Sequence, residues 1–364
     1  MKIATGLAIG HPASPDLAKQ AVTQAMEKAG LEIATSVLLF LTPEFARDPQ
    51  PTLLAASKAS NCTNIVGCSA AGIFTEQEWV LGSAAVAAMV FGDGISLAPS
   101  HRPKPDDLIL SLAAPNAINT TWLSEPGIRY GGVSGDATGQ GPFKVWCGGK
   151  VVPEGHCETT IQGASGFVGI SQGIRALSRP QEVTQVSGYD VQNLAGQPAL
   201  NILVRELPLD VRELDKIPLH LIMAGVTFGD PATAVAEGRY RLVPVISVNS
   251  DDRSTTLSTR LELGENMFWA LRQPLAAERD MRMMLDRLES QCATAPDFGL
   301  FFPCMGRGPY FYGGIDRDLE LVKQRFPGMP LIGFYGNGEI GELNGSNQLF
   351  QYAAVLSLFS DHHV

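Results

Sequence analysis

Short apolar runs alternate with amphipathic stretches along this chain. Residues 37–41 and 298–303 are continuously apolar, which is typical of strands buried on both faces. Asp316 precedes a stretch that places Leu319 and Val322 on one stripe, as expected of a helix that packs against a sheet. The pattern predicts an α/β protein of the mixed α+β kind, in which strands and helices follow one another.

Three further stretches are typical of helices. Ser14 and Pro15 provide a hydroxyl cap and a proline at the first helical position, and Gly30 ends the same segment. Residues 276–292 form an amphipathic stretch with a methionine-rich stripe, which we expect to fill a core. Residues 198–213 also look helical and could join two halves of the molecule. Residues 219–263 lie between the helical stretches expected over 198–213 and 276–292, and we expect them to be rich in strands.

A strand followed by a glycine-rich turn occurs three times. The turns are Gly67 to Gly72, Gly131 to Asp136 and Gly333 to Glu339, each after a short apolar run. The similar apolar segments 83–91 and 349–359 follow the first and the third turn. Self-similarity of this kind predicts internally repeated β-α-β-β units that form two associated halves, with their turns near one cleft. We place the domains at 1–205 and 206–364.

Composition excludes several classes of protein. The chain has 364 residues and a formal net charge of -10, with its Lys and Arg scattered, so a nucleic-acid partner is not expected. The N-terminus lacks a signal-peptide pattern, and the apolar runs are shorter than the ~20 residues that span a bilayer. The six cysteines form no C-x-x-C pair. These features predict a cytoplasmic protein without a membrane segment and without a metal site.

A match to the dinucleotide-binding pattern lies in the third turn. Gly336, Gly338 and Gly341 have the G-x-G-x-x-G spacing. A dinucleotide fold requires a helix directly after this motif, and the residues that follow are strand-like. We therefore predict no cofactor.

Charged and polar residues of the turns suggest a small ligand instead. Glu339 and Asp136 each follow a turn glycine, and Arg307 lies between two glycines. Arginine suits a carboxylate and the acids suit an ammonium, so together they would fit a zwitterion such as an amino acid. An internal arginine–acid pair that stabilises the turns is the equally weighted alternative. The predicted ligand-binding residues are Arg307, Glu339, Asp136, Asn337, Ser134, Cys68, Ser69 and Cys304.

An enzyme is the second hypothesis. Cys68, Cys304 or Ser69 could act as the nucleophile of an acyl transfer, but none has a histidine in a comparable setting. We therefore assign no catalytic residue. A scaffold whose glycine turns serve only tight packing is the third hypothesis.

Five ordered motifs resemble the FIST family. They are residues 302–308, 333–341, 67–72, 131–136 and 193–200, and the likeness runs from about Val37 to Phe359. The resemblance implies a sensory module that binds small ligands such as amino acids or their derivatives. Bacterial members are often joined to signalling output domains, and a eukaryotic relative carries an F-box.

The resemblance also guides the choice of site. Family members often have Gly-Glu after the first turn, and here Ile73 follows Gly72. We therefore expect the ligand at the C-terminal turn, with Glu339. The expected partners are a small polar metabolite and a separate signalling protein, and oligomerisation is an alternative route for the output.

Overall fold

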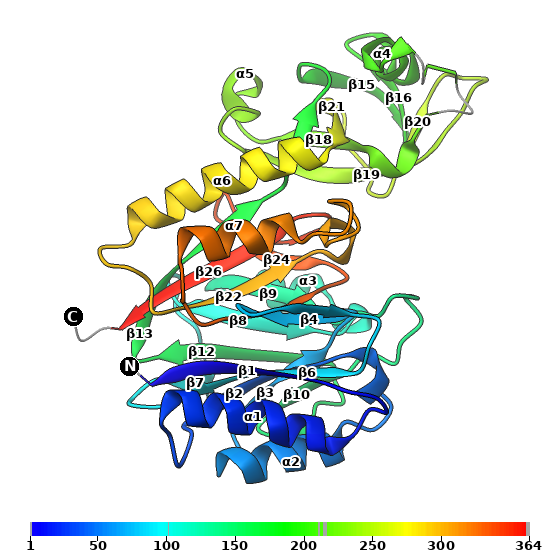
Figure 1. The fold of residues 1–364 in the computed structure, drawn as a ribbon. Coiled ribbons are helices and arrows are strands. Elements are labelled where there is room, and N and C mark those ends of the chain that lie inside the picture. Colours follow the sequence, from blue (N-terminus) through cyan, green and yellow to red (C-terminus); the bar gives the residue numbers. More distant parts are fainter. Residues whose placement is uncertain (1, 101, 210–211, 214–216, 362–364) are drawn as a thin grey trace. The chain divides into compact units, whose positions relative to one another are not determined.

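The computed structural model describes residues 2–100, 102–209, 212–213 and 217–361. The chain forms two compact units (Figure 1). Unit 1 combines residues 1–171 with residues 281–364, and unit 2 comprises residues 172–280. Three six-stranded sheets build unit 1, and we call them sheets A, B and C.

Each sheet of unit 1 draws strands from distant parts of the chain. Sheet A has the order β1 (Ile3–Ile9), β6 (Ala85–Phe91), β2 (Ser36–Leu41), β3 (Ile65–Ser69), β10 (Val145–Cys147), β11 (Lys150–Val151). Sheet B has the order β13 (Ala164–Ser171), β26 (Ala354–Asp361), β22 (Phe298–Pro303), β23 (Leu331–Tyr335), β4 (Gly72–Thr75), β5 (Trp79–Leu81). Sheet C has the order β7 (Ser96–Pro99), β12 (His156–Gln162), β8 (Leu108–Ala113), β9 (Ile128–Val133), β24 (Glu339–Leu343), β25 (Ser346–Phe350).

The three sheets share one pairing pattern. Each contains a single parallel pair, namely β2 with β3, β22 with β23 and β8 with β9, and the other neighbours are antiparallel. Each parallel pair is completed by a hairpin from another segment. The hairpin β4–β5 joins sheet B, β10–β11 joins sheet A and β24–β25 joins sheet C. No sheet is therefore complete without strands from elsewhere in the chain.

The first glycine of each predicted turn lies inside a strand. Gly67, Gly131 and Gly333 sit opposite the preceding parallel strand of their sheets. A Cβ at these positions would lie 1.8, 2.0 and 1.8 Å from the partner's carbonyl oxygen, respectively. Real Cβ atoms do not approach so closely, so these sites require glycine because two backbones are in contact.

Helices cover the outer faces of unit 1. Helices α1 (Pro15–Ala29) and α2 (Gln50–Ser60) pack on one face of sheet A (Figure 1). Helix α7 (Arg317–Arg325) and the second half of α6 (Pro274–Gln291) pack on sheet B. The largest apolar core lies between the three sheets. The shorter elements of this unit are α3 (Thr120–Leu123), η1 (Pro43–Phe45), η2 (Pro115–Ala117) and η6 (Met305–Arg307).

Unit 2 is a closed ring of antiparallel strands. Its order is β14 (Ile174–Ala176), β21 (Asn266–Arg272), β15 (Gln181–Ser187), β16 (Asp190–Leu194), β20 (Thr255–Leu257), β19 (Tyr240–Val248), β18 (Ile222–Thr227), and β18 returns to pair with β21. The short β17 (Gln197–Pro198) pairs with β16. Helix α4 (Ala199–Glu206) adds Leu200 and Leu203 to a separate apolar core. The remaining elements are α5 (Pro231–Ala234) and η5 (Leu219–Leu221).

The mixed α+β class and most predicted elements are confirmed, and two predictions need correction. The apolar segment 349–359 is not one strand, because β25 ends at Phe350 and β26 begins at Ala354. The helix expected over 198–213 ends at Glu206, and residues 210–211 lie outside the described part. Among the described residues, no helix combines the length and the apolar character needed to cross a membrane.

Candidate functional site

The three glycine-bearing segments meet in unit 1. The Ser69 and Ser134 hydroxyl oxygens lie 3.0 Å apart, and the Ser134 hydroxyl donates to the Ser69 carbonyl at 2.5 Å. The Asn337 backbone N–H donates to the Val133 carbonyl at 3.0 Å. These contacts bring Ser69, Ser134 and Asn337 together in one junction.

Asn337 is the exposed member of this junction. Ser69 and Ser134 are buried, whereas the Asn337 side chain is accessible. A Cβ on Gly135 would lie 3.0 Å from the Asn337 side chain, so this side chain lies over the backbone of Gly135. The junction therefore presents one exposed amide side chain next to the buried Gly135.

Glu339 begins β24 and is fully buried, so it does not point off the end of the sheet as expected. Its carboxylate accepts a hydrogen bond from the Ala353 backbone N–H at 3.1 Å and contacts the Cys304 thiol. The backbone of Cys304 in turn forms an isolated parallel β-bridge with Gly336. The Glu339–Cys304 pair thus lies directly behind the turn that carries Asn337.

Arg307 belongs to a second buried polar cluster. Its Nε donates to the Asp318 carboxylate at 2.7 Å, and its other nitrogens donate to the Ser171 carbonyl and hydroxyl at 2.7 and 2.8 Å. Arg307 is 2% exposed and Asp318 is fully buried. The acid that faces Arg307 is therefore Asp318, which was not among the residues predicted for the site.

Asp316 carries an extra negative charge into the same cluster. It caps α7 by accepting the Leu319 N–H at 2.9 Å, and the Tyr335 hydroxyl donates to its other oxygen. Burial, helped by the charge of Asp318, raises the pKa of Asp316 to about 6. This carboxyl therefore changes its charge close to neutral pH.

The Asp136 carboxylate accepts hydrogen bonds from its own loop. It accepts backbone N–H groups of Thr138 at 3.0 Å and Gly141 at 2.8 Å, among others. Partial burial works against the charged form, but these hydrogen bonds outweigh it and lower the pKa of Asp136. The carboxylate is therefore ionised at neutral pH and stays beside the Ser134–Gly135 segment.

The candidate nucleophiles lie in unfavourable surroundings for acyl transfer. Cys68 is fully buried, and burial raises the pKa of its thiol well above the ordinary value. Burial and the neighbouring Glu339 likewise raise the pKa of Cys304. The Ser69 hydroxyl accepts the Lys144 N–H at 3.0 Å and faces Ser134 rather than a histidine. Nucleophilic catalysis needs a thiolate or an adjacent base, so this geometry does not favour it.

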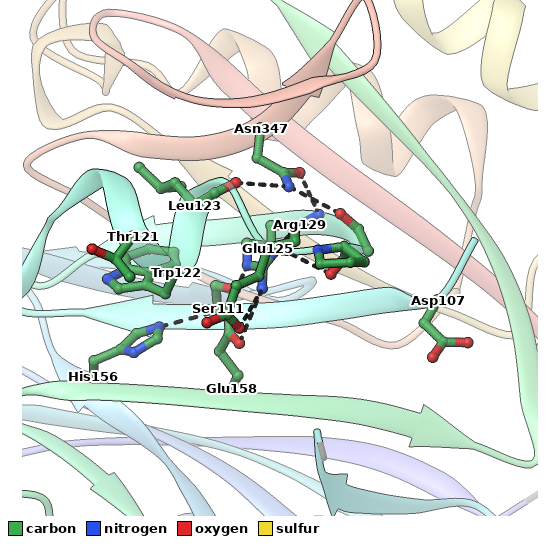
Figure 2. A network of polar contacts seen from close by, with 12 residues as sticks. Asp107, Ser111, Thr121, Trp122, Leu123, Glu125, Arg129, His156, Glu158 and Asn347 are labelled. Atoms are coloured by element: carbon green, nitrogen blue, oxygen red, sulfur yellow. Dashed lines mark hydrogen bonds and ion pairs between the residues drawn. The ribbon is translucent and has the colours of Figure 1, made fainter. Parts of the chain in front are cut away.

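A buried ion pair in sheet C escaped the sequence reasoning. Arg129 on β9 is fully buried, and its Nε donates to the Glu158 carboxylate at 2.6 Å (Figure 2). The Ser111 hydroxyl donates to the same carboxylate at 3.0 Å, and the His156 ring lies 3.6 Å from it. Burial opposes the charged form of Glu158, but the neighbouring His156 and Arg129 prevail and lower its pKa.

Asn347 attaches the hairpin β24–β25 to this network. Its side-chain oxygen accepts the Arg129 backbone N–H at 2.8 Å (Figure 2). Its side-chain nitrogen donates to the carbonyls of Leu123 and Gly127 at 3.1 and 2.9 Å. The Asn347 side chain therefore holds the hairpin β24–β25 to β9, the strand that carries Gly131.

Two domain families match most of the chain. The FIST N domain matches residues 35–197, and the FIST C domain matches residues 199–342. This protein belongs to the FIST family. FIST domains are generally taken as sensory or signal-transduction domains.

Relatives of the FIST chain occur in bacteria and eukaryotes. An uncharacterised protein of Mycobacterium tuberculosis is 26% identical over 387 residues, which cover 98% of this chain and all of that protein. An uncharacterised protein of Mycobacterium bovis is 27% identical over 70% of this chain and 68% of its own length. F-box only protein 22 of Homo sapiens is 35% identical over 77 residues, 20% of this chain and 18% of that protein.

The FIST domains and the compact units divide the chain differently. The domain matches change between residues 197 and 199, whereas unit 2 begins at Gln172 and ends at Asp280. The boundary at 205/206 stays a prediction.

The described residues of the FIST chain contain no group of three or more His, Cys, Asp or Glu side chains arranged to hold a metal ion.

Proposed function

We propose that this FIST protein is a sensory protein that binds a small polar metabolite, such as an amino acid, where its three glycine-bearing segments meet. The observation that carries this proposal is the direct bonding of Ser69 with Ser134 and of Asn337 with Val133. Three distant segments converge there on one exposed amide side chain. Convergent polar groups over a backbone surface are typical of small-ligand sites.

The proposed roles follow from exposure and charge. Asn337 contacts the ligand, and the ionised Asp136 attracts its ammonium group. The buried Ser69 and Ser134 fix the position of the turns. A carboxylate ligand would be bound by the Asn337 amide and neighbouring backbone N–H groups.

The remaining predicted residues would support the turn from behind. Glu339 and Cys304 hold the segment 336–338, and Cys68 packs in the core behind Ser69. Arg307 orders the loop after β22 through Asp318. We further propose that the three segments are copies of one unit, that the protein is cytoplasmic, and that its output passes to a separate signalling protein or through oligomerisation.

A thermal-shift screen with amino acids and related metabolites tests the proposal. A ligand at one hundred times its Kd stabilises the folded state by about 2.7 kcal/mol, which raises Tm by several degrees in a protein of this size. Asn337→Ala should abolish this rise. Asn116→Ala, which truncates another exposed asparagine of unit 1, should leave it unchanged.

The outcomes separate the hypotheses. If no metabolite raises Tm, or if Asn337→Ala and Asn116→Ala respond alike, ligand binding at this junction is refuted. A scaffold whose glycine turns serve only tight packing predicts that no metabolite raises Tm.

A further inference from the structure

Three thiols lie together between sheets A and C. Cys147 ends β10 of sheet A, and Cys157 is the second residue of β12 in sheet C. Strand β10 packs against β12, and the Cys147 and Cys157 thiols are close enough to act on each other's ionisation. Cys68 on β3 lies close to Cys157. All three belong to, or pack against, the same apolar core.

The members of this cluster differ in accessibility. Cys147 is partly exposed, whereas Cys157 is 5% exposed and Cys68 is fully buried. The neighbouring Cys157 thiol stabilises the Cys147 thiolate and lowers the pKa of Cys147 to about 7. The same pairing and burial raise the pKa of Cys157. Cys147 is therefore both the more accessible thiol and the one that ionises near neutral pH, with a second thiol beside it.

We propose that Cys147 and Cys157 form a reversible disulfide that links sheet A to sheet C when the protein meets a peroxide. An accessible, ionised thiol beside a second thiol is the arrangement of peroxide-sensitive cysteine pairs. None of the residues proposed to contact the metabolite takes part, so formation of the disulfide can be tested separately from metabolite binding.

The reaction is balanced with hydrogen peroxide as the oxidant. The Cys147 thiolate attacks one peroxide oxygen, an S–O bond forms, the O–O bond breaks, and the leaving hydroxide takes up a proton to become water. The Cys157 sulfur then attacks the Cys147 sulfur, the S–S bond forms and the S–O bond breaks. The Cys157 proton leaves with the departing oxygen as a second water. The two sulfurs together lose two electrons, and the peroxide gains them.

The disulfide would act on the first glycine-bearing segment. Residue Val145 of β10 pairs with Cys68, and the neighbouring Lys144 N–H donates to the Ser69 hydroxyl at 3.0 Å. Linking the end of β10 to β12 restrains the strand that anchors Ser69. Oxidation thus stiffens one side of the junction of the three segments.

The experiment follows the thiols of the full-length protein. The reduced protein is treated with hydrogen peroxide, alkylated, digested and analysed by mass spectrometry. We expect a Cys147–Cys157 linked peptide, the loss of two of the six thiols, and full recovery with dithiothreitol. Cys292→Ser should form the same linked peptide, because Cys292 lies apart in the core beside α6.

Two variants of Cys157 separate the disulfide from the activation of Cys147. Cys157→Ser retains a hydroxyl donor, so it should prevent the disulfide and leave Cys147 readily alkylated at pH 7. Cys157→Ala removes the donor, and Cys147 alkylation at pH 7 should slow roughly fivefold, because a two-unit rise in pKa lowers the thiolate fraction more than it raises nucleophilicity.

The proposal is overturned if peroxide converts Cys147 to sulfinic or sulfonic acid without a linked peptide. It is equally overturned if Cys147 links to a cysteine other than Cys157, or if Cys157→Ala leaves the alkylation rate unchanged.

Discussion

The buried polar clusters show how single residues depend on their surroundings. Arg307 and Arg129 each face a carboxylate inside unit 1, at 2.7 and 2.6 Å. Such pairs add little net stability compared with apolar replacements, but removal of one partner leaves a buried charge and is costly. The Arg307 cluster differs from the Arg129 network because it holds the additional acid Asp316.

The pH dependence of stability should report on Asp316. Its folded-state pKa of about 6 lies above the ordinary 3.8, so the folded protein holds this proton more tightly than the unfolded chain. Stability from this group is therefore full below about pH 4, falls between about pH 4 and 6, and is level above. Asp316→Asn cannot ionise, so its stability relative to wild type should rise by about 3 kcal/mol across that window.

Urea unfolding at a series of pH values measures this difference. Tyr335→Phe removes a hydrogen bond that lowers the pKa of Asp316, so its downward slope should extend to higher pH. Parallel pH profiles for wild type and Asp316→Asn would contradict the assignment.

The sequence singled out Gly67, Gly131 and Gly333 as the first residues of glycine-rich turns. Each lies inside a strand instead, where it permits a close contact between neighbouring backbones. The pairing of Arg307 with Asp318 was not predicted, because it depends on how α7 packs against the segment after β22. Arg129 and Glu158 lie in separate strands, and nothing local links them.

At the scale of elements, this fold is distinguished by three hairpins, β4–β5, β10–β11 and β24–β25, each of which completes a sheet with strands from another part of the chain. Strands β2 and β22 were expected from apolar runs, and the apolar stripe of α7 predicted its buried face. The hairpin partners could not be predicted, because antiparallel pairing between distant segments leaves no periodic mark on either strand. The sequence showed a strand after the first and the third glycine turn without showing which sheet each strand would join.

The hairpin β24–β25 should depend on Asn347. Asn347→Ala removes three hydrogen bonds and leaves the buried Arg129 backbone N–H without this acceptor. We expect a loss of about 2–4 kcal/mol in the free energy of unfolding. Hydrogen–deuterium exchange of the β24 and β25 amides should accelerate as well.

The adjacent Gln348 provides the matched control. Its side chain donates to the Leu343 carbonyl within the same hairpin at 3.4 Å, so Gln348→Ala should change stability by less than about 0.5 kcal/mol. Asn347→Asp keeps the acceptor and loses both donors, which should give an intermediate loss. Equal effects of Asn347→Ala and Gln348→Ala would count against this anchoring role.

At the scale of the whole molecule, the two units are built differently. Unit 2 has its own core and a closed ring of strands from one continuous stretch. A fragment of residues 172–273 should therefore fold alone and unfold in one cooperative thermal transition. A fragment of residues 1–171 should not, because sheet B would lack β22, β23 and β26 and sheet C would lack β24 and β25.

Circular dichroism and calorimetry of the two fragments distinguish these outcomes. A cooperative transition in 1–171, or its absence in 172–273, would show that the units do not follow the strand pairings.

The hairpins that pair with strands from distant parts of the chain also determine the order in which the protein can fold as it is made. Strands β4 and β5 emerge early, yet Thr75 pairs with Ile332 near the other end of the chain. At about 5–20 residues per second, the roughly 250 intervening residues take about 12–50 s to synthesise. During that time β4 and β5 wait on the ribosome without their partner strand. A nascent chain of this design is therefore exposed to mispairing for longer than one built from neighbouring strands, and it depends more on chaperones that shield unpaired edges.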